Sequence, residues 1–448
     1  MKDFYILNSK TIAVANAKMN NASVKKLWKS FTLGESEIEI NSSEEFIFKI
    51  GCSTPPKIRE GSEYALRVDE NGAFIVAKDY PSLMRGFMSL VLKIEHQKEI
   101  FFIKCVEEQS EYRVKNRMIH ICVFPENDLY YIKKLVRLAA LCQYTHIVIE
   151  FWGTLKFDCL KELSWQNAFT KDEAKEIIRE CYELGIEPIP MFNHLGHAYG
   201  SRLCYGKHVV LDQNPKLDYL FTPDGWVWNF ESEETVALLK SIRKELYELF
   251  EDSSFFHIGC DEAYFVSKNE RMRKKFPDFL NTVTTEIEKE GKRPMLWVDM
   301  LLEKDTYPNC YATGEKGEVE ALRKATAKSS VFVDWQYGSI ETPIPTLKAL
   351  KDCGRDVMGA PWHEEKNYCA HIDTVADNNL FGVMLTTWHT LKTYMFTIPD
   401  FAKKCGAKGF VWNEYCGMWE EAATMLRRLS FEGNTLESAG WCKTQIEV

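Results

Sequence analysis

The chain has 448 residues and a mass of 52.0 kDa, with 45% hydrophobic and 27% charged residues, as in a globular protein larger than one ordinary domain. Its net charge of -9, its pI of about 5.7 and the lack of a basic stripe exclude a nucleic-acid partner. No apolar run is long enough for a signal peptide or a membrane span, and the 14 Cys residues occur singly. We therefore expect a cytoplasmic protein with free thiols and no membrane partner.

The first 110 residues are expected to form a small α/β domain. Short alternating segments at 45–50, 64–68 and 73–77 predict strands, and apolar residues at helical spacing predict a helix over 82–94. The boundary to the next domain is expected between residues 107 and 114.

From residue 114 onward, apolar strand-like runs alternate with amphipathic helical patterns. The eight predicted strands cover 117–123, 146–150, 187–192, 254–259, 294–298, 331–335, 356–360 and 382–386. The helical patterns include 128–142, 171–184, 233–250, 276–290, 318–327 and 343–352. Eight such units predict an α/β fold with a (β/α)8 TIM barrel over residues 111–448, whose chemistry lies at the carboxyl ends of the strands.

The segment His-Ile-Gly-Cys-Asp-Glu, residues 257–262, sets Asp261 and Glu262 directly after a strand-like run. Adjacent strand residues point in opposite directions, so two neighbouring carboxylates share a pocket only where the strand ends and the chain turns. A partly desolvated, protonated Glu can then donate a proton while its ionised neighbour stabilises positive charge. That is the chemistry of glycosidic bond cleavage. The competing interpretation is an acidic helix start.

His194 and His197 invite an interpretation as metal ligands. On a loop after a strand their spacing is weakly constrained, and the further ligands that zinc requires do not occur nearby. The chain also lacks a phosphate-binding glycine loop and a nucleophilic serine elbow. We therefore expect neither a metal nor another cofactor.

These motifs resemble family 20 glycoside hydrolases, the β-N-acetylhexosaminidases. Residues 257–262 are similar to the His-x-Gly-x-Asp-Glu signature of that family, and residues 190–197 resemble its Pro-Gly-His segment after the third strand. Other residues that occur in the family's order are Arg117, Trp297, Asp299 and Trp388. The small domain before the barrel also resembles the non-catalytic domain common in the family.

Two departures indicate a divergent branch. Glu150 follows the second strand where many members have a His and two Asp residues, and Cys260 stands where Gly is common. The resemblance implies that the 2-acetamido group of the substrate is the nucleophile, that Asp261 orients it, and that Glu262 is the acid and base. We expect the apolar walls and Asp261 to raise the pKa of Glu262.

The predicted substrate-binding set is Arg117, Glu150, His197, His257, Trp297, Asp299, Trp335, Tyr337, Trp362 and Trp388. The four tryptophans are expected to line a sugar pocket, with a place in the core as the alternative. Tyr337 is expected to donate a hydrogen bond to the acetamido carbonyl, with Tyr368 as the alternative. Arg117 is expected to bind the C3 and C4 hydroxyls, with a structural ion pair as the alternative. His257 either holds the carboxylate pair by a hydrogen bond or lies buried below it.

The sequence thus predicts an exo-acting retaining β-N-acetylhexosaminidase that removes terminal β-linked GlcNAc or GalNAc from a small glycan or glycopeptide. Two alternatives stay open: a catalytically weak carbohydrate-binding relative, and a barrel glycosidase that does not depend on the acetamido group. Retention of both Asp261 and Glu262 favours the enzyme. The oligomeric state is open, with a homodimer as one option.

Overall fold

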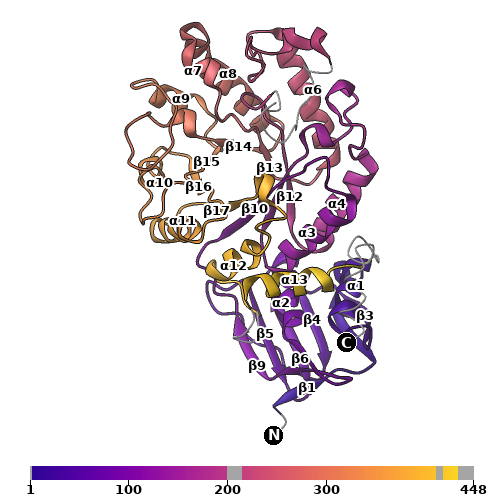
Figure 1. The fold of residues 1–448 in the computed structure, drawn as a ribbon. Coiled ribbons are helices and arrows are strands. Elements are labelled where there is room, and N and C mark those ends of the chain that lie inside the picture. The colour runs from indigo at the N-terminus through magenta and orange to yellow at the C-terminus, as the bar shows by residue number, and fades with distance from the viewer. Residues whose placement is uncertain (1–2, 199–213, 410–416, 432–448) are drawn as a thin grey trace.

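The computed structural model describes residues 3–198, 214–409 and 417–431. Two small sheets built from residues 4–109 precede a closed barrel of eight parallel strands (Figure 1). In Figure 1 the small α/β domain lies below the barrel. The predicted fold class, a (β/α)8 barrel preceded by a small α/β domain, is confirmed.

The small domain holds a six-stranded sheet of order β3-β2-β4-β6-β5-β9 and a three-stranded sheet of order β1-β8-β7. Its strands are β1 (Phe4–Ile6), β2 (Lys10–Asn16), β3 (Glu37–Ser43), β4 (Ile47–Gly51), β5 (Tyr64–Asp69), β6 (Gly72–Ala77), β7 (Ile94–Gln97), β8 (Ile100–Lys104) and β9 (Val106–Gln109). Its core includes Trp28, whose ring stacks on that of Phe87 with centroids 6.4 Å apart. The predicted strands at 45–50, 64–68 and 73–77 are β4, β5 and β6.

The barrel strands agree closely with the predicted runs. They are β10 (Asn116–Cys122), β11 (His146–Glu150), β12 (Glu187–Met191), β13 (Phe255–His257), β14 (Arg293–Trp297), β15 (Val331–Asp334), β16 (Asp356–Gly359) and β17 (Gly382–Thr386). Each pairs in parallel with the next, and β17 pairs with β10. The register aligns Cys122 with Glu150, Glu150 with Met191, and Met191 with His257. The carboxyl ends of these strands therefore lie in one layer.

Helices cover the outside of the barrel and one face of the larger small-domain sheet (Figure 1). The helices are α1 (Ala22–Phe31), α2 (Tyr80–Leu92), α3 (Leu129–Leu141), α4 (Lys171–Glu183), α6 (Glu233–Leu249), α7 (Tyr264–Lys268), α8 (Glu270–Lys289), α9 (Val319–Ala325), α10 (Pro345–Leu350), α11 (Glu365–Asn378), α12 (Thr397–Lys404) and α13 (Met418–Arg428). Short 3-10 turns are η1 (Ala17–Met19), η2 (Trp152–Thr154), η3 (Lys161–Leu163), η4 (Pro215–Leu220), η5 (Asp299–Leu301) and η6 (Trp388–Thr390). Within the described ranges, none of the helices has the length and apolar character needed to cross a bilayer.

Polar side chains begin the long barrel helices. The Thr170 hydroxyl accepts a hydrogen bond from the Glu173 N–H, and the Glu173 carboxylate accepts one from the Thr170 N–H. α4 therefore begins with a complete capping box. Asp128, Ser232 and Asn269 cap α3, α6 and α8 in the same way with a single side-chain acceptor. These caps fix where each helix leaves the loop that follows its strand.

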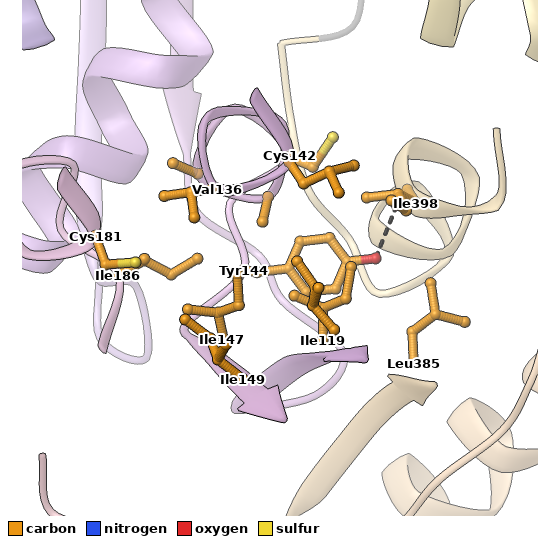
Figure 2. Close-up of a cluster of buried hydrophobic side chains, with 14 of the residues drawn as sticks. Ile119, Val136, Cys142, Tyr144, Ile147, Ile149, Cys181, Ile186, Leu385 and Ile398 are labelled. Carbon is orange, nitrogen blue, oxygen red and sulfur yellow. Dashed lines mark hydrogen bonds between the residues drawn. The ribbon is translucent and has the colours of Figure 1, made fainter. Parts of the chain in front are cut away.

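Two apolar layers hold the barrel together. One fills its interior and consists of Met118, Val148, Ile189, Met191, Phe255, Met295, Trp297, Val331, Val333, Met358, Ala360 and Met384. The other lies between strands and helices, and Figure 2 shows part of it around Tyr144, Ile119 and Ile147. The Tyr144 hydroxyl donates to the carbonyl of Ile398 at 2.8 Å, which ties α12 to this layer. Side chains at alternate strand positions thus point into different layers, because successive side chains of a strand point to opposite faces.

Candidate active site

The loop after β13 turns within a few residues. Gly259, Cys260 and Glu262 have φ angles of 67°, 77° and 50°, in the left-handed region. For a non-glycine residue this conformation costs about 1–3 kcal/mol, and such residues gather at functional sites. A Cβ atom on Gly259 would lie 1.6 Å from Oδ1 of Asn193, so only glycine fits there. The Gly of the His-x-Gly motif thus permits the turn that brings Asp261 and Glu262 to one side.

His197 joins the two carboxylates. Its Nε2 lies 3.2 Å from Oδ2 of Asp261 and 3.2 Å from Oε2 of Glu262. Its loop is fixed to the loop after β13, because the His194 N–H donates to the Ile258 carbonyl at 2.8 Å. Burial lowers the pKa of His197, but the two carboxylates outweigh burial and raise this pKa to about 10. An imidazolium therefore stands between two acids at neutral pH.

Glu262 accepts a hydrogen bond at each carboxylate oxygen. Oε1 lies 2.5 Å from the Tyr264 hydroxyl, and Oε2 faces His197. Burial raises the pKa of Glu262, but the bonds from His197 and Tyr264 outweigh it and hold this pKa below its ordinary value. The expectation of a raised pKa for Glu262 is therefore wrong, because it considered the apolar walls and Asp261 and not these two donors.

Asp299, at the end of β14, supports the strained backbone of Glu262. Its Oδ2 accepts from the Glu262 N–H at 3.2 Å and from the Thr313 hydroxyl at 2.8 Å. Burial and then the charge of Asp261 raise the pKa of Asp299 to about 8. Asp299 is thus the carboxyl group of this cluster that stays protonated at neutral pH.

Five aromatic side chains, here called the aromatic wall, lie beside the carboxylates. It consists of Trp297, Trp335, Tyr337, Trp362 and Trp388, from the ends of β14, β15, β16 and β17. Trp388 has its ring centroid 5.8 Å from that of Trp297, and Tyr337 lies 5.3 Å from Trp335 and 5.4 Å from Trp362. Trp297 is fully buried and forms the floor, whereas the other four are partly exposed. The structure brings all five predicted aromatic residues together.

Tyr337 is fixed with its hydroxyl inside this wall. Its oxygen accepts from the indole N–H of Trp388 at 2.7 Å and lies 3.3 Å from the Thr386 hydroxyl, which donates to the Pro361 carbonyl at 2.8 Å. The single hydrogen of Thr386 goes to Pro361, so the Tyr337 hydrogen has Thr386 at 3.3 Å as its partner and can turn to a nearer acceptor.

Glu150 supports the wall from below. It is fully buried, and its carboxylate binds His120 Nε2 at 2.9 Å and the Asn193 side-chain amide at 3.1 Å. The ring of His120 lies 4.7 Å from that of Trp388. Glu150 therefore positions His120 and Asn193 beside the pocket.

His257 lies buried beneath the site. Its Nδ1 accepts from the Gly259 N–H at 3.1 Å, and its ring lies 4.5 Å from that of Trp297. Burial lowers the pKa of His257 to about 3, so the ring is neutral. The predicted hydrogen bond from His257 to the carboxylate pair is wrong, because the chain turns at Gly259 before the carboxylates. The alternative of a buried His below the site is the one observed.

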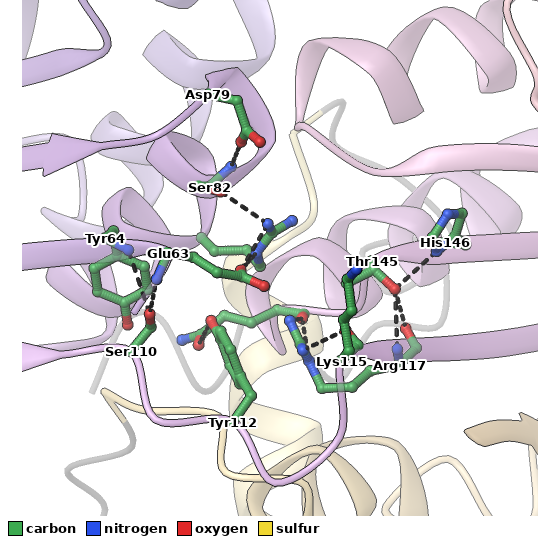
Figure 3. A network of polar contacts seen from close by, with 12 residues as sticks. Glu63, Tyr64, Asp79, Ser82, Ser110, Tyr112, Lys115, Arg117, Thr145 and His146 are labelled. Carbon is green, nitrogen blue, oxygen red and sulfur yellow. Dashed lines mark hydrogen bonds and ion pairs between the residues drawn. The ribbon is translucent and has the colours of Figure 1, made fainter. Parts of the chain in front are cut away.

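Arg117 lies at the amino end of β10, whereas the carboxylates follow the carboxyl end of β13. Figure 3 shows Arg117 beside Tyr112, Lys115 and Thr145. Arg117 is the second residue of β10, next to Met118, whose side chain points into the barrel. Because neighbouring strand residues point to opposite faces, Arg117 points away from the barrel interior. Its guanidinium lies 3.5 Å from the ring centre of Tyr112 and donates to the carbonyls of Val114, Lys115 and Gln143. The prediction that Arg117 binds sugar hydroxyls is therefore wrong. Among the described residues the predicted ion-pair alternative is not observed either, because the acceptors of Arg117 are carbonyl groups.

Tyr368 does not reach the site. It lies on α11, outside the barrel, is 1% exposed and donates its hydroxyl hydrogen to Asp400 of α12. The alternative that Tyr368 binds the acetamido group is wrong, because its hydroxyl is committed to this helix contact.

Three site residues were missed by the sequence reasoning. Tyr264 binds Glu262, Tyr311 donates to the Tyr264 hydroxyl at 3.0 Å, and the Trp226 ring lies 4.6 Å from that of His197. Tyr264 stands two residues after the Asp-Glu pair, so its position in sequence was a usable signal. Trp226 and Tyr311 belong to loops without a motif.

Buried polar atoms without a hydrogen-bond partner gather at this site. Among the described residues they include Asp261 Oδ1, Asp299 Oδ1, His257 Nε2, Trp297 Nε1 and Trp335 Nε1. Buried polar groups in native proteins are nearly always paired, so such a cluster is the signature of a polar ligand site. In the same parts of the chain, no three His, Cys, Asp or Glu side chains are arranged to hold a metal ion.

A closed parallel barrel with paired carboxylates at the carboxyl ends of its strands defines the class, a barrel glycoside hydrolase. Residues 152–430 match the family described as "Glycosyl hydrolase family 20, catalytic domain", which is more than half of the chain. The chain therefore belongs to glycosyl hydrolase family 20, and the resemblance read from its motifs is confirmed.

Several known proteins are similar to this chain. Hexosaminidase D from Bos taurus is 27% identical over 129 residues, which cover 29% of this chain and 35% of the bovine protein. An exo β-N-acetylglucosaminidase from Vibrio harveyi has a TM-score of 0.67 at 14% identity, covering 97% of this chain and 76% of that one. The β-N-acetylhexosaminidase from Bacteroides fragilis has a TM-score of 0.65 at 14% identity, covering 99% of this chain and 94% of that one. The structural likenesses show a shared fold, and the chain spans about a third of the bovine relative.

Proposed function

We propose that the protein is an exo-acting retaining β-N-acetylhexosaminidase that hydrolyses terminal β-linked GlcNAc or GalNAc with help from the substrate's own acetamido group. One observation carries the proposal: buried Asp261 has an unpartnered Oδ1 next to Glu262 and the aromatic wall. An acetamido N–H is a donor of the kind that this oxygen lacks.

In this mechanism Asp261 accepts the acetamido N–H while the acetamido oxygen attacks the anomeric carbon. The bond from that carbon to the glycosidic oxygen breaks, and positive charge develops on the oxazolinium ring. The side chain of Asp261 stabilises that charge electrostatically. No enzyme ester forms, which is the exception among retaining glycosidases.

Glu262 protonates the departing oxygen and later deprotonates the attacking water. His197 supports this role, because its Nε2 carries a proton only 3.2 Å from Oε2 of Glu262. When the acetamido N–H binds Asp261, the carboxylate holds the imidazolium less strongly. Transfer of the His197 proton to Glu262 then supplies the acid.

The aromatic wall supports a sugar with an acetamido group. Tyr337 retains a hydrogen that suits the acetamido carbonyl, and Trp335 retains an unpartnered indole N–H. The faces of Trp362 and Trp388 offer apolar surface to the acetamido methyl and to the sugar ring. A small glycan or glycopeptide is the proposed substrate class.

Nitrophenyl β-glycosides of GlcNAc, GalNAc, glucose and galactose test this function. We expect kcat/KM for the 2-acetamido substrates to exceed that for the 2-hydroxyl substrates at least about a thousandfold, given the effective molarity of an oriented intramolecular nucleophile. Comparable rates would favour a glycosidase without acetamido dependence. Binding of GlcNAc without turnover would favour the carbohydrate-binding relative. A Glu262→Gln preparation controls for contaminating activity.

We also propose a reducing, cytoplasmic location. Cys52 and Cys159 are exposed free thiols. Exposed free thiols persist in reducing compartments. Localisation of the tagged full chain by microscopy tests this proposal.

A further inference from the structure

The backbone folds Tyr264 back onto the carboxylate of Glu262. The Tyr264 N–H donates to the Glu262 carbonyl at 2.8 Å, and Ala263 between them has φ -76° and ψ 66°. This is an inverse γ-turn. The same carbonyl accepts from the Trp226 indole at 2.9 Å, and the rings of Trp226 and Tyr264 stack 6.4 Å apart. The phenol is thus held 2.5 Å from Oε1 of Glu262, at the short distance of a bond to a carboxylate.

Tyr311 fixes the hydroxyl of Tyr264 by a hydrogen bond. The Tyr311 hydroxyl donates to the Tyr264 hydroxyl at 3.0 Å, so the chain of donors runs from Tyr311 to Tyr264 to the carboxylate. Gln336 clamps the backbone of Tyr311, accepting from its N–H at 2.6 Å and donating to its carbonyl at 3.0 Å. Gln336 is 1% exposed. Tyr311 is therefore a rigid support for Tyr264 that comes from the loop after a different strand, β14.

We propose that Tyr264, supported by Tyr311, is a positioning residue that fixes the acid and base Glu262 and biases it toward the ionised form. The inference rests on the proposed function. His197 binds Oε2 and Tyr264 binds Oε1, so the two contacts together confine both carboxylate oxygens. A long, flexible Glu side chain held by one donor would rotate about the remaining bond. The second donor removes that freedom.

Tyr264→Phe tests the proposal, because it keeps the ring on Trp226 and removes only the hydroxyl. A donor to a carboxylate stabilises the ionised form, so its loss favours the protonated form. We expect the acid limb of kcat/KM, where Glu262 loses its charge, to move up by about 1 pH unit, the size of one hydrogen bond to a charged group. Tyr311→Phe should move it in the same direction by about a third of that, as expected of a second link in a chain.

The leaving group separates positioning from general damage. We expect Tyr264→Phe to lower kcat about tenfold for a disaccharide, which needs protonation of its glycosidic oxygen, and less than about threefold for a nitrophenyl glycoside. Tyr130→Phe is the matched control, because Tyr130 is exposed on α3 and its hydroxyl makes no hydrogen bond within the described residues. Circular dichroism checks that each variant is folded.

A second readout does not depend on activity. Carboxyl carbon-13 NMR of glutamate-labelled protein follows the ionisation of Glu262, whose resonance is assigned by its loss in Glu262→Gln. We expect its titration to move to higher pH in Tyr264→Phe and to stay at the wild-type position in Tyr130→Phe. Identical titrations of wild type and Tyr264→Phe would overturn the inference. A wild type without hydrolytic activity would instead overturn the proposed function, and the NMR titration would still decide the role of Tyr264.

Discussion

The imidazole Nε2 of His197 lies 3.2 Å from the carboxylate oxygen Oε2 of Glu262. The two residues come from loops after different strands, β12 and β13, which the barrel register brings side by side. The same nitrogen faces Asp261, so one cation serves two acids. Its removal should therefore affect both carboxylates at once.

His197→Gln should lower kcat/KM by about a hundredfold, the lower range of general acid catalysis, because a neutral amide cannot supply a proton or hold two carboxylates. His96→Gln, at an exposed position in the small domain, is the control and should leave kcat/KM unchanged. Steady-state kinetics on nitrophenyl β-GlcNAc measure the effect. Wild-type rates in His197→Gln would remove His197 from the mechanism.

The raised pKa of His197 also predicts a pH effect on stability. Its folded pKa of about 10 exceeds the ordinary value of 6.5, so its stabilisation is fully present below pH 6.5 and is lost as pH rises through about 10. Urea unfolding at pH 6, 8 and 10 should show this decline in the wild type and a weaker one in His197→Gln. Parallel declines in both would contradict the charge assignment.

Asp299→Asn tests the protonated carboxyl beneath the site. The folded pKa of Asp299 is raised from 3.8 to about 8, so the free energy of unfolding should fall as pH rises through that window. The loss is at most about 1.4 kcal/mol per pH unit. Asn keeps an acceptor for the Glu262 N–H and cannot ionise, so chemical unfolding of the variant should show a flatter pH dependence. An unchanged slope would show that Asp299 is already ionised in the folded protein.

Trp388→Ala tests the aromatic wall. The change removes ring area from the pocket and a donor to Tyr337, so substrate and transition-state binding should both weaken by about 2–3 kcal/mol. Trp419→Ala is the control, because Trp419 is half-exposed on α13. Inhibition by GlcNAc and kcat/KM measure the two effects. A fall in thermal stability alone would make Trp388 a core residue only.

Arg117→Met tests the correction at the amino end of the barrel. The change removes the donor from the buried carbonyls of Val114 and Gln143 and from the partly buried carbonyl of Lys115, so the free energy of unfolding should fall by about 3 kcal/mol. KM should stay within about twofold of the wild type, because Arg117 lies far from Asp261 along the barrel axis. Arg59→Met, at an exposed position, is the control for denaturant unfolding. A large rise in KM with unchanged stability would restore a role in substrate binding.

The barrel could be predicted because buried parallel strands appear in sequence as short apolar runs. β11 and β17 have the predicted bounds, and Trp297 and Trp388 follow their runs as predicted. α8 begins at Glu270, six residues before its predicted start, and continues through Pro277. Local patterns thus identified the strands better than the helix boundaries.

The errors at the site have physical causes. Arg117 stands at the start of its apolar run, whereas catalytic side chains follow the ends of theirs. The prediction for Arg117 rested on the order of residues in the family, and the direction of the strand places it at the other end of the barrel. The pKa of Glu262 depends on His197 and Tyr264, whose approach is set by tertiary structure and by a γ-turn. The pocket members after strand ends were therefore predictable from sequence, and the hydrogen bonds that set their charges were not.

Inhibition by a thiazoline that mimics the oxazolinium intermediate tests the central claim most directly. The account predicts that the wild type binds it at least about a hundredfold more tightly than GlcNAc, because the site stabilises the charged intermediate, and that Asp261→Asn loses most of this preference. Equal affinity for thiazoline and GlcNAc in the wild type, with a covalent enzyme ester trapped by a fluorosugar, would contradict acetamido assistance.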